Sequence, residues 1–134
     1  MSLYVDTSAL LKRYIDEPDS EVSERHLLGD PVWVTARHTW VEVRRNLGRL
    51  LAGRELRVAR EQFEEDWRSM NVVELDRETC RAAGEVAELT GSRTLDALHL
   101  AALRRAGAAD LTLLTFDARQ ARAARDLGIR VLGT

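Results

Sequence analysis

Short apolar runs alternate along the chain with longer amphipathic stretches. The runs contain β-branched or aromatic residues and are bounded by polar ones, which predicts five strands, over residues 3–5, 32–35, 71–75, 111–116 and 129–132. The stretches have the helical period and begin near Ser8, Ser20, Thr39, Arg54, Glu78, Leu95 and Ala118. Strands joined by helices need right-handed crossovers and form a parallel sheet that is covered on both faces. The pattern therefore predicts an α/β fold.

The composition limits the number of domains and the kinds of site. A length of 134 residues accommodates one domain spanning 1–134, and 45% hydrophobic with 31% charged residues is typical of a globular protein. The formal net charge of -2 indicates no overall attraction to nucleic acid, so any basic patch must be local. Cys80 is the only cysteine, which excludes an intramolecular disulfide and a thiolate zinc cluster. Because no run has membrane-spanning length and the start lacks a signal-peptide pattern, we expect a cytoplasmic protein.

Two aspartates are expected at the carboxyl ends of strands, where ligands bind in open parallel sheets, and a third is expected at a helix start. Asp6 follows the first strand, Asp117 ends the fourth, and Asp96 stands at the start of a later helix. Helix capping is an alternative role for each, because aspartate is a preferred N-cap and its charge suits the first helical turn. Taken singly, Asp6 and Asp117 fit the capping role better than a catalytic one.

Glu42 is harder to explain as a cap. It lies in the mostly apolar stretch Trp40-Val41-Glu42-Val43, and its alternative role is a weak surface pair with Arg45. Four carboxylates at one crevice would repel one another unless a cation neutralised them. Oxygen ligands without a Cys/His set favour Mg²⁺ or Mn²⁺, and Mg²⁺ leaves positions for water and a substrate phosphate. The four acids together therefore indicate phosphate chemistry.

The acids lie in four segments that carry a resemblance. The segments are Val5-Asp6-Thr7-Ser8-Ala9, the third helix with Glu42, Arg93-Thr94-Leu95-Asp96-Ala97-Leu98-His99-Leu100-Ala101, and Leu114-Thr115-Phe116-Asp117. In this order they resemble the PIN-domain ribonucleases, in particular the VapC toxins of bacterial toxin–antitoxin systems. The resemblance covers nearly the whole chain. It implies a three-layer α/β/α fold with a parallel five-stranded sheet. It also implies a Mg²⁺- or Mn²⁺-dependent endoribonuclease, which a cognate antitoxin inhibits and which is commonly a homodimer.

The resemblance also implies roles for individual residues. Asp6, Glu42, Asp96 and Asp117 match the acidic quartet of the family, which holds the metal directly or through water. Thr7, Ser8 and Thr115 stand where PIN domains often place a hydroxyl that orients a carboxylate, with local capping as an equal alternative. The expected products carry 5′-phosphate and 3′-hydroxyl ends. Some PIN domains have a further acid after the last aspartate, whereas this chain has Arg119 and Gln120, which argues against a strongly held second metal.

Basic residues near the acids are candidate RNA contacts. Arginine binds phosphate with a planar fork, so we expect RNA contacts from Arg44, Arg45 or Arg49, with a solvated helix face as the alternative for each. Arg93, nearer to Asp96, is a candidate contact for RNA or antitoxin, and its alternative is a pair with an acid. His99 lies three residues after Asp96 and suits a general acid, but its apolar neighbours favour packing. A stripe at helical spacing that includes Phe63 and Trp67 is typical of a core, and an antitoxin helix is its alternative partner.

Other functions fit the sequence less well. A phosphoacceptor receiver needs adjacent acids after the first strand and a late lysine, but Thr7 follows Asp6 and the only lysine is Lys12. A phosphatase with an Asp-x-Asp pair is excluded by Ser8. The remaining alternative is a non-catalytic PIN-like module that acts with an antitoxin in operator DNA binding.

Overall fold

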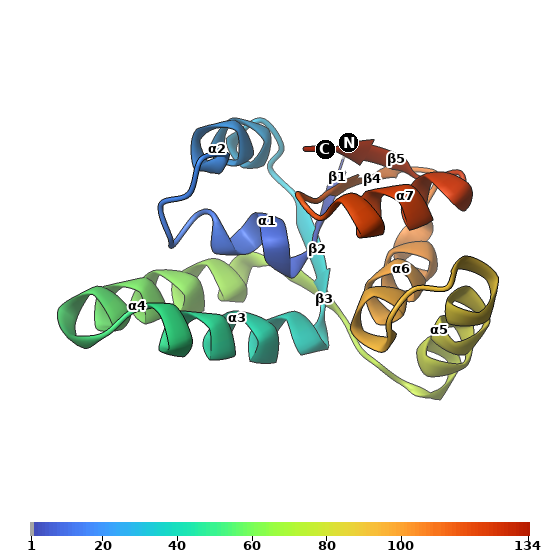
Figure 1. Ribbon diagram of the computed structural model, residues 1–134, viewed down its shortest axis with the longest axis horizontal. Helices are drawn as coiled ribbons and strands as arrows, with labels where there is room; N and C mark the ends of the chain where they lie inside the picture. Colours follow the sequence, from blue (N-terminus) through green and yellow to red (C-terminus); the bar gives the residue numbers. More distant parts are fainter. Residues whose placement is uncertain (1) are drawn as a thin grey trace.

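Five parallel strands form one sheet in the computed structural model of the chain, which describes residues 2–134 (Figure 1). The strands are β1 (Ser2–Val5), β2 (Trp33–Ala36), β3 (Asn71–Val73), β4 (Leu111–Leu114) and β5 (Arg130–Leu132). Their order in the sheet is β3-β2-β1-β4-β5, and every neighbouring pair is parallel. The expected α/β class and parallel sheet are confirmed.

Helices cover both faces of the sheet and make three layers (Figure 1). They are α1 (Thr7–Leu11), α2 (Ser20–Leu28), α3 (Arg37–Leu50), α4 (Gly53–Ser69), α5 (Arg77–Thr90), α6 (Thr94–Gly107) and α7 (Ala118–Asp126). The first four pack on one face, where α3 and α4 form a long antiparallel pair, and the last three pack on the other. Each helix begins within two residues of its expected start.

The alternation of side chains along the strands divides the core into two halves. Leu3 and Val5 of β1 join the half under α1 to α4, whereas Tyr4 points into the half under α5 to α7. On β4, Leu113 joins the half under α5 to α7, and Leu114 joins the half under α1 to α4. Because both faces are covered, these strands are apolar throughout, as buried parallel strands require.

Two strands end earlier than the sequence pattern predicts, for identifiable reasons. The third ends at Val73 because its only partner, β2, ends opposite it at Ala36. The fourth ends at Leu114, and the Thr115 hydroxyl that follows bonds to Asp6 across the sheet edge. Both changes occur at carboxyl ends and leave the topology as predicted.

The direction in which strands are added reverses between β1 and β4. From β1 the chain moves outward through β2 and β3, and then returns through α5 and α6 to place β4 on the other side of β1. At such a switch point the loops after the two strands separate and leave a crevice. The segments that begin at Asp6 and Thr115 border this crevice. Within residues 2–134, no helix has the length and apolarity needed to cross a membrane.

Candidate active site

The four expected acids come from four separate elements around the crevice. Asp6 and Asp117 are the N-caps of α1 and α7, Glu42 lies in the second turn of α3, and Asp96 lies in the first turn of α6. Burial raises the pKa of Asp96, and the charges of Asp117 and Asp6 raise it further against the attraction of Arg93 and His99. The three aspartates are therefore close enough to repel one another.

Asp6 is the most enclosed of these acids, with only 4% of its surface exposed. Its Oδ1 accepts hydrogen bonds from Ser8 Oγ at 2.7 Å and from the Ala9 amide at 3.1 Å, and its Oδ2 accepts one from Thr115 Oγ1 at 2.5 Å. Burial nevertheless raises the pKa of Asp6, although these bonds and nearby His99 act against the shift. A buried carboxylate of this kind is stabilised by a nearby cation.

The hydroxyls flanking the acids hold carboxylates in place. Besides its bond to Asp6, Thr115 Oγ1 accepts from the Asp117 amide at 3.1 Å, and Ser8 Oγ accepts from the Phe116 amide at 3.0 Å. Thr7 Oγ1 donates to Glu42 Oε1 at 2.7 Å. These hydroxyls thus connect the segments after β1 and β4 with helix α3.

Asp117 combines both roles that the sequence left open. Its Oδ1 accepts from the amides of Arg119 at 2.8 Å and Gln120 at 3.2 Å, which is the geometry of an N-cap. Its Oδ2 has no hydrogen bond within the described chain, residues 2–134. One oxygen therefore fixes the side chain, and the other is free for a ligand.

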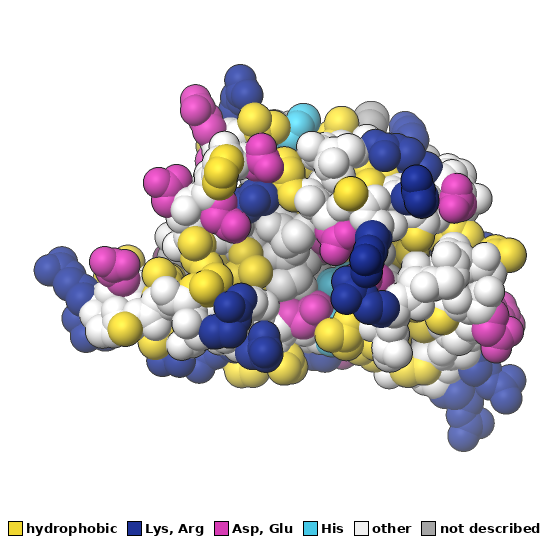
Figure 2. All heavy atoms as spheres, in the orientation of Figure 1, with side chains coloured by type: hydrophobic (Ala, Val, Ile, Leu, Met, Phe, Trp, Pro, Cys, Tyr) yellow, Lys and Arg dark blue, Asp and Glu magenta, His cyan; other side chains and the backbone are white. Residues whose placement is uncertain are grey.

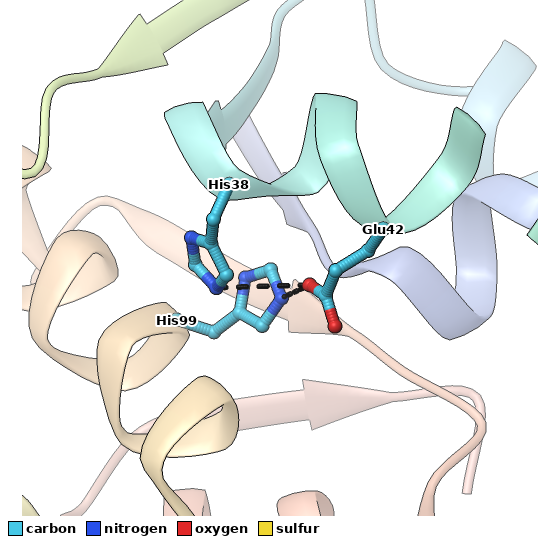
Figure 3. Close-up of side chains that lie close together, drawn as sticks. All are labelled: His38, Glu42 and His99. Atoms are coloured by element: carbon cyan, nitrogen blue, oxygen red, sulfur yellow. Dashed lines mark hydrogen bonds and ion pairs between the residues drawn. The ribbon is translucent and has the colours of Figure 1, made fainter. Parts of the chain in front are cut away.

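Glu42 is held by a buried network that begins at Tyr4 and includes the two histidines drawn in Figure 3. His99 Nε2 lies 2.9 Å from Glu42 Oε1, and His99 Nδ1 lies 2.9 Å from the hydroxyl of Tyr4. Burial raises the pKa of Glu42, but the hydrogen bond and charge of His99, with Thr7 and His38, outweigh it and lower the pKa overall. Glu42 is therefore ionised at neutral pH.

The direction of each hydrogen bond in this network follows from the ionised carboxylate. A carboxylate only accepts, so His99 Nε2 carries the hydrogen that faces Glu42. Burial raises the pKa of Tyr4 well above its ordinary value, which keeps the phenol protonated and able to donate to His99 Nδ1. His99 therefore donates to Glu42 from Nε2 and lies within hydrogen-bonding distance of Tyr4 through Nδ1. Oε2 of Glu42, which points away from the histidines in Figure 3, has no partner among residues 2–134.

A second histidine, His38, packs against the first, with ring centroids 4.1 Å apart. Burial and the nearness of His99 lower the pKa of His38 to about 4, although Glu42 and the Leu95 carbonyl favour its charged form. Its Nε2 lies 3.1 Å from the Leu95 carbonyl oxygen and must donate to it. His38 is therefore a neutral packing partner that limits the movement of the His99 ring.

These three side chains form one possible metal cluster. In residues 2–134, His38, Glu42 and His99 are the one set of three such groups whose ligand atoms all lie within 4.8 Å of one another. However, the Nε2 atoms of both histidines donate their hydrogens to oxygen atoms, and His99 Nδ1 lies 2.9 Å from the Tyr4 hydroxyl. Among residues 2–134, His38 Nδ1 is the one ring nitrogen of this pair without a hydrogen-bond partner, and it is buried. In this arrangement the cluster supports Glu42 through hydrogen bonds.

The aspartates and the free oxygen of Glu42 have the chemistry of a hard-cation site. Asp6, Asp96 and Asp117 supply carboxylate oxygens; burial raises the pKa of both Asp6 and Asp96, and the charges of Asp117 and Asp6 raise that of Asp96 further. Because these oxygens do not all approach within 4.8 Å, they suit an ion that keeps several waters, as Mg²⁺ does. The residues present therefore fit the metal that the resemblance implies.

The expected basic contacts divide into two groups. Arg45 and Arg49 follow Glu42 by three and seven positions on α3 and thus share its helical face. Arg44 turns away, stacks on Trp40 at 5.2 Å and lies 3.5 Å from Glu64 of α4. Lys and Arg side chains gather on both sides of the hollow that contains acidic and histidine side chains (Figure 2).

Sequence reasoning missed part of this site. The sequence pattern places Tyr4 only within the first expected strand and favours packing for His99, which is 3% exposed yet bonded to Glu42. The i, i+4 spacing of His38 and Glu42 on one helix was the available signal for their proximity. Nothing in the local sequence connects Tyr4 with His99, which lie 95 positions apart.

Comparison with known proteins agrees with this geometry. The family model described as PIN domain matches residues 3–126. The chain belongs to the PIN domain family. This PIN domain is 31% identical over 131 residues to Ribonuclease VapC46 of Mycobacterium tuberculosis, covering 98% of this chain and 96% of that protein.

Solved structures share the fold at lower identity. VapC20 of Mycobacterium tuberculosis, described as a Sarcin-Ricin loop cleaving toxin, has a TM-score of 0.70 at 18% identity and covers 90% of this chain and 94% of that one. VapBC2 of Rickettsia felis, solved bound to a DNA fragment from its promoter, has a TM-score of 0.69 at 13% identity and covers 98% of each chain. The three-layer arrangement expected for a PIN domain is confirmed.

Proposed function

We propose that this PIN domain is a metal-dependent endoribonuclease toxin that hydrolyses RNA phosphodiester bonds and is neutralised by a cognate antitoxin. The observation that carries the proposal is the convergence of Asp6, Asp96 and Asp117 at one crevice, with Glu42 held beside them in its ionised form. The 31% identity to a ribonuclease over nearly the full length supports the reaction, and neighbours such as VapBC2 support an antitoxin partner.

The acids divide the work between binding and proton transfer. Asp6, Asp96 and Asp117 would hold Mg²⁺ or Mn²⁺, directly or through water. When bound, such an ion would supply positive charge near the scissile phosphate and make water more acidic. Glu42 uses its unbonded Oε2 to orient the attacking water and to accept its proton. The attack breaks the bond from phosphorus to the 3′-oxygen, which takes a proton from solvent, so the products carry 5′-phosphate and 3′-hydroxyl ends.

The decisive experiment compares purified wild type with identically prepared Asp96→Asn on a mixed RNA pool. We expect cleavage with Mg²⁺ or Mn²⁺, none with chelator, and none by the variant, because the charge of Asp96 is needed to hold the ion. End labelling should detect 5′-phosphates. A 2′,3′-cyclic phosphate product would contradict the mechanism, and equal cleavage by both proteins would indicate a contaminating nuclease.

A folded protein that never cuts RNA but still binds antitoxin and operator DNA would favour the alternative of a non-catalytic module. Binding of the purified pair to operator fragments distinguishes the two functions. The presence of all four acids around one crevice favours the nuclease.

His99 acts on catalysis through Glu42 and is therefore a positioning residue. Replacing it in His99→Leu removes the donor to Oε1, and we expect kcat to fall about 10- to 100-fold with little change in KM. His99→Gln keeps an amide donor and should recover part of the loss. Circular dichroism separates this effect from unfolding, because the side chain is buried. Full kcat in both variants would show that Glu42 needs no such support.

A further inference from the structure

A hollow of about 430 Å³ lies beside the acidic centre, between the connection from α5 to α6 and the start of α7. Arg93, Arg119 and Arg122 line it together with Ser92 and two carboxylates, those of Asp96 and Asp126. Asp96 belongs both to this wall and to the proposed metal site. The hollow and the acidic centre are therefore continuous.

The charges in the hollow are not balanced by the protein. Arg119 and Arg122 have no ion pair within 4.0 Å in residues 2–134, and Arg93 lies 3.8 Å from Asp96. Once Asp96 is engaged with a cation, three guanidinium groups face Asp126 alone. Guanidinium groups bind phosphate oxygens through two parallel hydrogen bonds.

The backbone adds to this positive field. Helix α6 has 14 residues, and its N-cap residue, Arg93, makes no side-chain hydrogen bond to the first turn. The start of α6, with the positive end of its dipole, therefore adjoins the hollow at Arg93 and Asp96. Both features favour an anion at this position.

We propose that the hollow binds the phosphate of a nucleotide adjacent to the cleaved bond of the RNA, through Arg119 and Arg122. This rests on the proposed function. A strand whose scissile phosphate lies at the acidic centre must leave it along one of the adjoining walls, and this wall shares Asp96 with the centre. The size of the hollow is within the range of nucleotide-sized ligand sites.

The test uses one cleavable oligonucleotide and a series in which each phosphate near the cut, in turn, is replaced by a neutral methylphosphonate. Arg119→Gln and Arg122→Gln are compared with wild type and with Arg81→Gln, an exposed arginine of α5 outside the hollow. For both hollow variants we expect KM to rise about tenfold with kcat changed less than about twofold. For wild type, KM should rise by the same factor when the methylphosphonate stands at one particular position. On that oligonucleotide the KM of the hollow variants should rise no further.

Other results would overturn the proposal. If KM rises equally on every oligonucleotide, and rises in Arg81→Gln as well, the arginines act only by general charge attraction. If KM is unchanged in the hollow variants, RNA does not enter the hollow. Weakened antitoxin binding with unchanged KM would assign the arginines to the partner protein instead.

If wild type fails to cut, the same series is read by fluorescence anisotropy with Ca²⁺. If a methylphosphonate at one position weakens binding to wild type but not to Arg119→Gln, the hollow is supported as a phosphate site even though the proposed function has failed. If the effect is the same at every position, or absent, both the phosphate site and the proposed function are overturned.

Discussion

Asp6→Asn is expected to reduce metal-dependent RNA cleavage by more than about 1,000-fold, which corresponds to several kcal/mol of lost transition-state stabilisation. Asp6 lies between the segments that follow β1 and β4 and bonds to Ser8 and Thr115. Asparagine keeps the shape but loses the charge that holds the ion. The measurement is the single-turnover cleavage rate at saturating Mg²⁺, with Asp110→Asn, an exposed aspartate away from the crevice, as the control.

The same substitution has the opposite effect on the metal-free fold. Burial raises the folded-state pKa of Asp6 above its unfolded value, so its contribution to stability is lost as pH rises through the folded pKa, and at neutral pH the charge is destabilising. Asp6→Asn without metal should therefore unfold at the same temperature as wild type or higher. Saturating Mg²⁺ should raise the unfolding temperature of wild type by several degrees and leave that of the variant unchanged. A variant that is both inactive and unstable would contradict this account.

Phe63→Ala is expected to lower the free energy of unfolding by about 3–5 kcal/mol, a large part of the stability of a typical domain. Phe63 is 0% exposed in the core half under α1 to α4. Its ring meets Tyr14 edge-on and Trp67 at a tilt, both with centroids 5.6 Å apart. Urea denaturation followed by circular dichroism measures the loss.

Val58→Ala on the same helix is the matched control. Val58 is 50% exposed, so its truncation should change the free energy of unfolding by less than about 0.5 kcal/mol. At low temperature, where Phe63→Ala remains folded, we expect RNA cleavage per folded molecule to persist, since Phe63 contacts none of the acids. Equal losses in the two variants would mean that this half of the core is not tightly packed.

Much of the fold was predictable because local patterns and global packing agree. The apolar runs of β1 and β4 are typical of buried parallel strands, and Asp6 and Asp117 are preferred residues at the helix starts that follow them. Placing both acids at one crevice needed only the rule that ligands bind at the carboxyl ends of such strands. The helical spacing of the apolar stripe that includes Phe63 likewise predicted its place in the core.

The support around Glu42 was not predictable from local patterns. Tyr4, His38 and His99 meet only after β1, α3 and α6 have packed together, and their distances depend on that packing. The arginine hollow depends in the same way on how α7 lies against the connection before α6. Residue types at these positions are compatible with an ordinary surface or core, so only the assembled structure distinguishes the roles.

The position of β1 in the sheet bears on the timing of activity during synthesis. The strand made first pairs with β4, and Asp6 bonds to a threonine 109 positions later. In a nascent chain, the acidic centre therefore cannot assemble until the segment that contains Thr115 has left the ribosome. Contacts of such long sequence separation also form slowly, which extends the delay. The order of strands thus separates the translation of this protein from the onset of its chemistry and gives a partner time to bind.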